Sequence, residues 1–158
     1  MTIAAALGLL GFLAACFAAA IPGAFFRPGQ WYANLAKPRW NPPNWVFAPA
    51  WTILYVTVAV SGWLVWRKSG FAGAVFPFEV YAAGLFINAM WSAIFFGWHK
   101  PGLAFFDVTL LWLSIIATIL LFYPIEQNAG LLLLPYLGWV SFAGALNFAV
   151  WRMNRKAV

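Results

Sequence analysis

The stretch GLAFFDVTLLWLSIIATILLFY, residues 102–123, decides the fold class because it carries a single charged side chain, Asp107. A helix needs about 20 predominantly apolar residues to cross the roughly 30 Å of hydrocarbon in a bilayer. The apolar residues of this stretch run continuously and do not alternate with polar ones, as they would in a membrane β-strand. Only helices and closed barrels satisfy their backbone hydrogen bonds in lipid, so the stretch predicts a transmembrane helix.

Four further apolar stretches surround it, with prolines at or near most of their ends. The expected helices span residues 4–26, 45–66, 78–97, 102–123 and 129–151. The sequence therefore predicts an all-α integral membrane protein, a single domain over residues 1–158 that forms a bundle of five transmembrane helices. Pro49 and Pro135 fall inside the second and fifth helices, where proline removes a backbone hydrogen bond, and we expect both helices to bend there.

The composition excludes a soluble fold. Hydrophobic residues make up 65% of the chain and charged residues 8%, whereas a soluble domain carries about 25% charged residues. The net charge is +6, but the basic residues stand in short connections beside apolar stretches and form no stripe that could follow a phosphate backbone. We therefore expect the lipid bilayer, and not nucleic acid, to be the partner of these charges. Cys16 is the single cysteine, and no cluster of His and Cys predicts a metal site or a cofactor.

The basic residues predict the orientation, because cytoplasmic connections carry an excess of Lys and Arg. Arg67 and Lys68 lie on one side of the expected membrane. Seven of the nine basic residues lie on the other side, namely Arg27, Lys37, Arg39, Lys100, Arg152, Arg155 and Lys156. In a bacterial inner membrane the C-terminus would be cytoplasmic and the N-terminus would face outward.

Polar groups gather in the half of the bundle next to the longest connection, residues 27–44. Polar side chains inside a membrane are costly and tend to face the bundle interior. Counted along the helices, Asn88, Asp107 and Asn147 fall in or near this half, together with Trp51 and Tyr55. We expect a mostly apolar pocket among the helices, covered by the connection as a lid loop. The alternative is that the two asparagines only hold helices together by hydrogen bonds, and that Asp107 bonds a neighbouring helix, with Asn147 as its candidate partner.

Nine of the eleven tryptophans fall into two groups. Those at helix ends are typical of the aromatic belt at membrane surfaces: Trp45, Trp63, Trp66, Trp98 and Trp151. A belt does not explain Trp31 and Trp40 in the connection, or Trp51 and Trp139 within helices. The sequence carries no nucleophile–base pair and no phosphate-binding loop, so conventional catalysis is not predicted.

Small residues spaced four apart predict close helix contacts. One row in the first helix consists of Gly11, Ala15, Ala19 and Gly23, which we expect to pack inside the bundle. A second row in the third helix, Ala89, Ala93 and Gly97, is the candidate for a dimer interface.

A series of motifs resembles one known family along nearly the whole chain. The series begins with Trp31-Tyr32-x-x-Leu35-x-Lys37-Pro38-x-Trp40-x-Pro42-Pro43 and continues with Trp45-Val46-Phe47, Pro49-x-Trp51-Thr52 and Leu54-Tyr55. It goes on through Asn88-x-x-Trp91-Ser92, Phe95-Phe96-Gly97, Ala104, Asp107, Pro135-Tyr136-x-x-Trp139 and Leu146-Asn147. In order and spacing these residues resemble the TspO/MBR family, which contains the bacterial tryptophan-rich sensory proteins and the mitochondrial translocator protein, the peripheral benzodiazepine receptor.

The resemblance implies a membrane receptor, sensor or transporter, usually a homodimer. Its pocket under the first loop would bind porphyrins such as protoporphyrin IX and haem, and isoquinoline- or benzodiazepine-like ligands. The family's ligand-binding positions fall on Trp31, Trp40, Trp51, Tyr55, Asn88, Trp91, Asp107, Trp139 and Asn147. Trp51 and Trp139 also match the two tryptophans that the family links to porphyrin breakdown, and they would be the catalytic residues of a light- and oxygen-dependent enzyme. A third hypothesis is a membrane scaffold that acts through protein partners.

Two positions depart from the family pattern. Gly84 stands where the family often has Gln, so a polar contact to the ligand is missing or a helix contact replaces it. Phe148 stands between Leu146 and Arg152 where the cholesterol motif requires Tyr, which argues against sterol binding. For a porphyrin, we expect Lys37 or Arg39 in the loop to reach the propionate groups.

Overall fold

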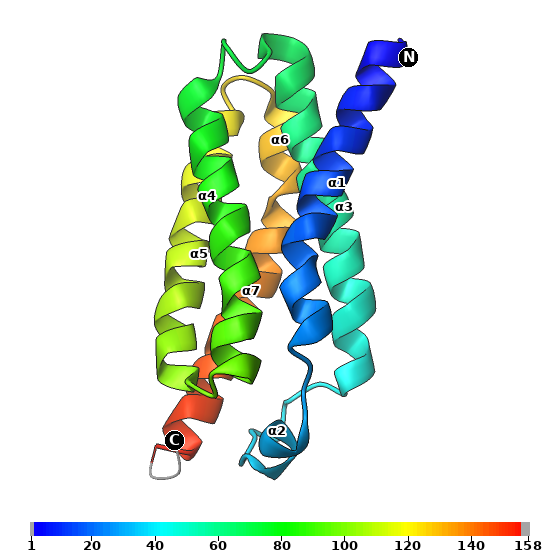
Figure 1. Cartoon of the computed structure of the whole chain (residues 1–158). Coiled ribbons are helices and arrows are strands. Elements are labelled where there is room, and N and C mark those ends of the chain that lie inside the picture. Colours follow the sequence, from blue (N-terminus) through cyan, green and yellow to red (C-terminus); the bar gives the residue numbers. More distant parts are fainter. Residues whose placement is uncertain (1, 156–158) are drawn as a thin grey trace.

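The computed structural model describes residues 2–155, which form helices and no strand (Figure 1). Lys156, one of the basic residues counted above, lies outside the described residues. The elements are α1 (Ile3–Phe25), α2 (Gln30–Asn34), η1 (Asn44–Val46), α3 (Phe47–Ser69), α4 (Val75–Ser92), η2 (Ala93–Gly97), α5 (Pro101–Phe122), α6 (Gln127–Leu132) and α7 (Leu134–Met153).

Five segments are long and apolar enough to cross a membrane, as predicted. They are Ile3–Phe25, Asn44–Ser69, Val75–Gly97, Pro101–Phe122 and Gln127–Met153. The long helices lie side by side, with the N-terminus at one end of the bundle and the C-terminus at the other (Figure 1). The short helix α2 lies in the connection between α1 and α3, at the same end as the C-terminus. We call this the α2 end of the bundle.

Pro49 and Pro135 stand in the first turns of their helices, whereas Pro22 lies inside α1. Pro135 stands in the first turn of α7, and the fifth span is interrupted at Leu133, between α6 and α7. Pro49 stands in the first turn of α3 and does not interrupt that helix, so the bend expected there is wrong. The first N–H groups of a helix have no acceptor within the helix, and a proline at these positions removes no hydrogen bond.

Helices α1 and α3 pack closely in the half of the bundle near the N-terminus. The indole nitrogen of Trp63 donates a hydrogen bond to the carbonyl of Ala5 at 2.8 Å. Gly62 lies so close to Phe12 that a Cβ atom there would come within 2.8 Å of the phenyl ring. Phe12 and Cys16 are the buried residues of α1. These contacts fix α1 to α3 at one end.

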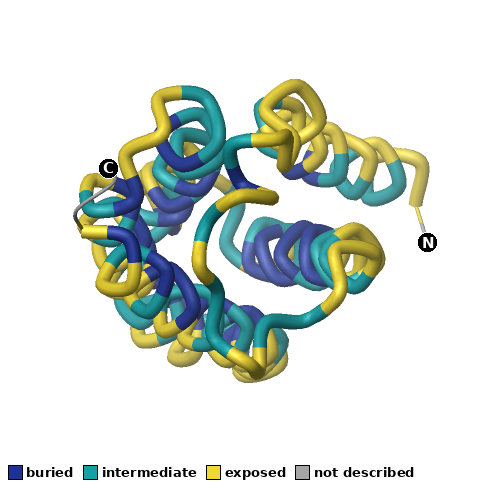
Figure 2. The backbone as a smooth tube through the Cα atoms, turned by 90° about the horizontal axis from the view of Figure 1, so that it is seen from below, coloured by how far each residue is buried: buried dark blue, intermediate teal, exposed yellow. Residues whose placement is uncertain are grey.

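The row of small residues in α1 packs inside the bundle only in part. Ala19 packs against the core and a Cβ atom at Gly23 would lie 3.3 Å from Ser92 of α4, so the expectation is wrong for Gly11 and Ala15. Gly11 and Ala15 are exposed, and nothing lies within 4 Å of a Cβ atom added at Gly11. The helix is the least buried of the five spans, with 11% of its most apolar window buried against 33–39% in the others. Figure 2 shows α1, the tube that ends at N, as chiefly exposed or half-buried. The exposed face of α1 therefore faces lipid.

Gly84 allows a close helix contact. A Cβ atom at this position would come within 2.9 Å of the hydroxyl oxygen of Ser114, so the missing side chain brings α4 close to α5. The sequence left open whether Gly84 means a missing polar contact to the ligand or a helix contact in its place. The structure shows the helix contact.

Candidate functional site

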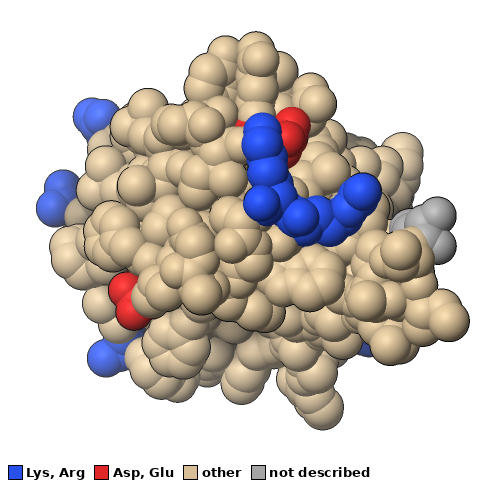
Figure 3. All heavy atoms as spheres, turned by 90° about the horizontal axis from the view of Figure 1, so that it is seen from above, with Lys and Arg blue, Asp and Glu red and all other residues tan. Residues whose placement is uncertain are grey.

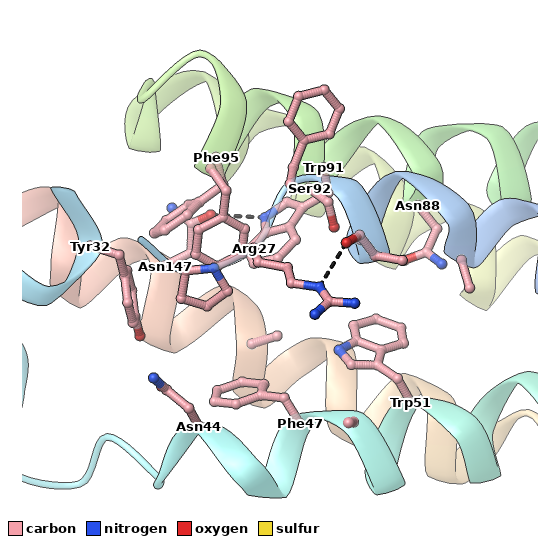
Figure 4. A pocket seen from close by; sticks show the side chains of 18 of the residues that line it. Arg27, Tyr32, Asn44, Phe47, Trp51, Asn88, Trp91, Ser92, Phe95 and Asn147 are labelled. Atoms are coloured by element: carbon pink, nitrogen blue, oxygen red, sulfur yellow. Dashed lines mark hydrogen bonds between the residues drawn. The ribbon is translucent and has the colours of Figure 1, made fainter. Parts of the chain in front are cut away.

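A cavity of about 720 Å³ opens among the helices in the half of the bundle near the α2 end. Its wall comes from α1, α3, α4, η2 and α7, together with the connection that contains α2. The larger or polar side chains of the wall include Phe17, Arg27, Tyr32, Asn44, Phe47, Trp51, Tyr55, Asn88, Trp91, Ser92, Phe95 and Asn147. Figure 4 shows most of them pointing into the same space. The cavity lies in the size range of small-molecule sites, about 300–1,000 Å³.

Two asparagines of the wall also join helices. The side-chain amide of Asn88 in α4 donates to the hydroxyl of Tyr55 in α3 at 2.7 Å. Asn147 in α7 accepts from the indole nitrogen of Trp91 at 3.0 Å and donates to the carbonyl of Pro101 at 2.7 Å. Both asparagines are buried, so these bonds satisfy groups that would be costly unpaired in an apolar surrounding. The polar part of the wall is therefore held rigidly.

Asp107 does not join this network. Its Oδ2 atom is buried and has no hydrogen-bond partner within residues 2–155. The bond to Asn147 considered from the sequence does not form, because the amide of Asn147 is used by Trp91 and Pro101. Asp107 is also not among the residues that line the cavity.

The aromatic wall is centred on Trp51. Its ring lies 5.6 Å from that of Tyr55 and 6.3 Å from that of Tyr136, measured between centroids. Trp139 lies 6.5 Å from Trp51 and nearly perpendicular to it, with an interplanar angle of 86°. Trp139 does not line the cavity, and instead borders a separate apolar groove between α3 and α7. Trp139 therefore lies behind the cavity wall, in contact with Trp51 and Phe47.

The two loop tryptophans lie outside the cavity. Trp31 stacks on His99 with ring centroids 4.3 Å apart, and Trp40 is half exposed with one edge against Phe142. The aromatic loop residue that does line the cavity is Tyr32, which is buried against Phe95. Burial raises the pKa of the Tyr32 hydroxyl above its ordinary value. The tryptophans therefore hold the loop in place, and Tyr32 forms its inner surface.

The end of α7 ties down the loop. The backbone N–H of Ala36 donates to the side-chain oxygen of Asn154 at 3.0 Å, and the amide of Asn154 donates to the carbonyl of Ala36 at 2.9 Å. This pair of bonds joins residues far apart in the sequence and attaches the loop to the end of α7.

The basic residue at the cavity is Arg27 and neither of the two expected from the sequence. The ammonium group of Lys37 donates to the carbonyls of Ala33 and Leu35 and lies 4.5 Å from the ring centre of Tyr32. Lys37 and Arg39 do not line the cavity, whereas Arg27 does. The spacing of Phe17, Ala20, Ala24 and Arg27 would have indicated it, since residues three and four apart share one helix face.

Within residues 2–155, no group of three or more His, Cys, Asp and Glu side chains converges on a position for a metal ion. The cavity offers aromatic faces, fixed amides, a few hydroxyls and a guanidinium. Such a set binds a flat apolar molecule with a small number of polar groups.

Comparison with known proteins agrees with the motifs. The model of the TspO/MBR family matches residues 12–152. The chain belongs to the TspO/MBR family. Protein CrtK of Rhodobacter capsulatus is 43% identical over 147 residues, covering 90% of each chain. The tryptophan-rich sensory protein of Cereibacter sphaeroides is 43% identical over 145 residues, 92% of this chain and 90% of that protein. The human translocator protein is 39% identical over 150 residues, 92% of this chain and 89% of its own length.

This TspO/MBR chain is therefore a multi-pass membrane protein of a sensor and translocator family. Trp51, Tyr55, Asn88, Trp91 and Asn147 line its cavity. The other four residues predicted to bind ligand lie elsewhere, namely Trp31, Trp40, Asp107 and Trp139.

Proposed function

We propose that the protein is a membrane receptor, sensor or transporter that binds porphyrins such as protoporphyrin IX and haem, and flat drug-like molecules, in the cavity under the first loop. The observation that carries this proposal is the aromatic wall. Trp51, Trp91 and Phe95 contribute large flat faces to a cavity of about 720 Å³. Aromatic rings pack against such faces in offset or edge-on arrangements.

The wall is suited to hold its ligand without rearranging. Trp91 and Asn147 are bonded to each other, and so are Asn88 and Tyr55. A ligand that enters such a site immobilises few side chains, which lowers the entropic cost of binding.

A second candidate function is light- and oxygen-dependent degradation of the porphyrin. The contact between Trp51 and Trp139 favours it, because an indole on the cavity wall is backed by another one. A bound porphyrin would absorb light, and molecular oxygen would be the oxidant. The contribution of the protein would be to hold an oxidisable indole beside the macrocycle.

The proposal includes an orientation and an assembly. Six of the described basic residues lie at the α2 end of the bundle, which we infer faces the cytoplasm of a bacterium. The opposite end, seen in Figure 3, is mostly uncharged and carries the exposed ion pair between Lys68 and Glu126. We also propose that the protein forms a homodimer through exposed faces of the bundle. We do not propose a sterol as its ligand.

Quenching of tryptophan fluorescence by protoporphyrin IX in the dark tests binding. Wild type should show saturable quenching in detergent, and Trp51→Phe should keep saturation with a smaller amplitude because one of the nearest donors is lost. The matched control is Trp45→Phe, since Trp45 is 74% exposed and does not line the cavity. Quenching that rises linearly without saturation in wild type would contradict the proposal.

Illumination of the same samples tests the second candidate. An absorbing product that forms in wild type and is lost in both Trp51→Phe and Trp139→Phe, while dark binding persists, would establish turnover. Equal product in all three proteins would remove the enzyme hypothesis and leave the receptor proposal standing.

A further inference from the structure

Arg27 stands at the cavity without a carboxylate partner. Its Nε–H group donates to the carbonyl of Ala24 at 2.7 Å, which fixes the guanidinium beside the end of α1. A guanidinium carries five N–H donors, so this bond leaves four for other acceptors. In Figure 4 the guanidinium points into the cavity on the side of Trp51. The arrangement presents a fixed cation to whatever occupies this space.

Two of the three acidic residues lie at the other end of the bundle, and the third, Asp107, lies outside the cavity lining. Glu126 pairs with Lys68 at the opposite end of the bundle, the one ion pair found within residues 2–155. Glu79 lies in the first turns of α4 at that same end, and Asp107 does not line the cavity. None of the residues that line the cavity is acidic. An anion that reaches Arg27 therefore meets no competing carboxylate from the protein.

The surrounding charge has the same sign. Lys37, Lys100 and Arg152 belong to the α2 end of the bundle, as Arg27 does, and Asp107 in the second turn of α5 is the one acidic residue in that half of the bundle within residues 2–155. Several like charges at one end create a positive potential that attracts anions to the membrane surface and to the cavity.

The cavity is exposed between α1 and α3. Ala24 of α1 and Ala48 and Thr52 of α3 line the cavity and are exposed. Phe17, also exposed, lies roughly 12 Å along the axis from the end of α1, at about 1.5 Å per residue. The opening therefore extends to the depth of the lipid chains, and Arg27 stands at its polar end.

We propose that Arg27 is the anion-binding residue of the cavity, which takes a membrane-dissolved ligand with a flat apolar body and a terminal carboxylate. The apolar body lies against Trp51 and Trp91, and the carboxylate accepts hydrogen bonds from the guanidinium at the membrane surface. Arg binds carboxylates through paired, charge-assisted hydrogen bonds, which suits a fixed guanidinium. This inference rests on the proposed function and adds the chemical class that the site selects.

The test compares protoporphyrin IX with its dimethyl ester, which keeps the macrocycle and removes both carboxylates. Binding is measured by fluorescence quenching in phosphatidylcholine nanodiscs, for wild type, Arg27→Gln and the matched control Arg39→Gln. Both arginines are exposed and near the loop, and only Arg27 lines the cavity. We expect Arg27→Gln to bind the acid about tenfold more weakly, a change of about 1.4 kcal/mol, and to bind the ester as wild type does. Arg39→Gln should leave both ligands unaffected.

The outcomes separate this inference from the proposed function. Wild-type binding of the ester with no Arg27-dependent preference for the acid would overturn the role of Arg27 and leave the receptor proposal intact. Saturable binding of neither compound would overturn both. Repeating the titration in nanodiscs with phosphatidylglycerol identifies the source of the anion. A weaker acid preference there shows that a lipid headgroup uses the same guanidinium, and an unchanged preference shows that the ligand carboxylate does.

Discussion

At the residue scale, Asn147 connects three helices and forms part of the cavity wall at the same time. Its side chain in α7 bonds Trp91 of α4 and the carbonyl of Pro101 at the start of α5. Asn88 likewise forms part of the wall and joins two helices, because its amide donates to the hydroxyl of Tyr55 in α3. The sequence left two roles open for these asparagines, helix contact or pocket, and the structure places each residue in both positions.

Replacing Asn147 by Ala should destabilise the protein. The Trp91 indole N–H would lose its partner in a part-buried position, and hydrogen bonds between membrane helices are worth about 0.6–2 kcal/mol. We expect a loss of that size in the free energy of unfolding, measured by titration with sodium dodecyl sulfate and circular dichroism. Asn34→Ala, at an exposed residue of α2, is the control. Equal stability of the Asn147 variant and wild type would show that the network contributes nothing.

The sequence predicts which helical residues line the cavity better than it predicts which loop residues do. Trp51, Tyr55 and Asn88 lie on regular helices, where spacing determines which residues share a face. Trp31 and Trp40 lie in the connection, where the direction of a side chain depends on contacts with His99 and Phe142 that no periodicity reveals. Motif spacing identifies such residues without showing which way they point.

At the element scale, α1 is fixed to the bundle near its N-terminus and borders an open cavity at its other end. The fixed part depends on Gly62, where α3 carries no side chain and receives the ring of Phe12. The open part is lined on both helices by small residues, including Ala24 and Ala48. The pairing of α1 with α3 could not be read from hydropathy, because the apolar stretches carry no information on which neighbour each one contacts.

Gly62→Ala should weaken the packing of α1 on α3. The added methyl group would lie 2.8 Å from the ring of Phe12 and 3.1 Å from that of Tyr81, and overpacking costs about 1–3 kcal/mol. Gly138→Ala is the control, because nothing lies within 4 Å of a Cβ atom at that position in α7. Thermal unfolding should show a lower midpoint for Gly62→Ala and no decrease for Gly138→Ala. The reverse order would contradict the described contact.

The lid loop should become more mobile in Asn154→Ala. The substitution removes both hydrogen bonds between Asn154 and the backbone of Ala36 and leaves the loop sequence unchanged. Hydrogen exchange measured by mass spectrometry should then be faster for peptides that contain Ala36, and unchanged for peptides of α5. Loop protection equal to that of wild type would mean that the stacked Trp31 and the rest of the loop hold the lid without Asn154.

At the scale of the whole molecule, hydropathy alone predicts the number of spans, because each must exclude polar groups from lipid over its full length. Other features of the sequence predict more: Pro135 indicates a bend near the break at Leu133, and the polar residues near the longest connection indicate the end of the bundle at which the cavity lies. Which side chains line that cavity depends on how distant parts of the chain fit together.

The charge distribution predicts the orientation of the whole molecule. With Cys16 replaced by Ala, a cysteine introduced at Lys68 should react with a membrane-impermeant thiol reagent in intact cells. A cysteine at Arg39 should react only after the membrane is opened. Both residues are exposed and lie at opposite ends of the bundle, so they form a matched pair. Reaction of Arg39→Cys in intact cells would place the α2 end outside and reverse the proposed orientation.

The most direct measurement is a crystal structure of the protein grown from a lipid phase with protoporphyrin IX. We predict macrocycle density in the cavity between Trp51 and Trp91, with a carboxylate near Arg27 and the loop residue Tyr32 closing over it. Porphyrin density only outside this cavity, for example in the apolar groove beside Trp139, would contradict the account.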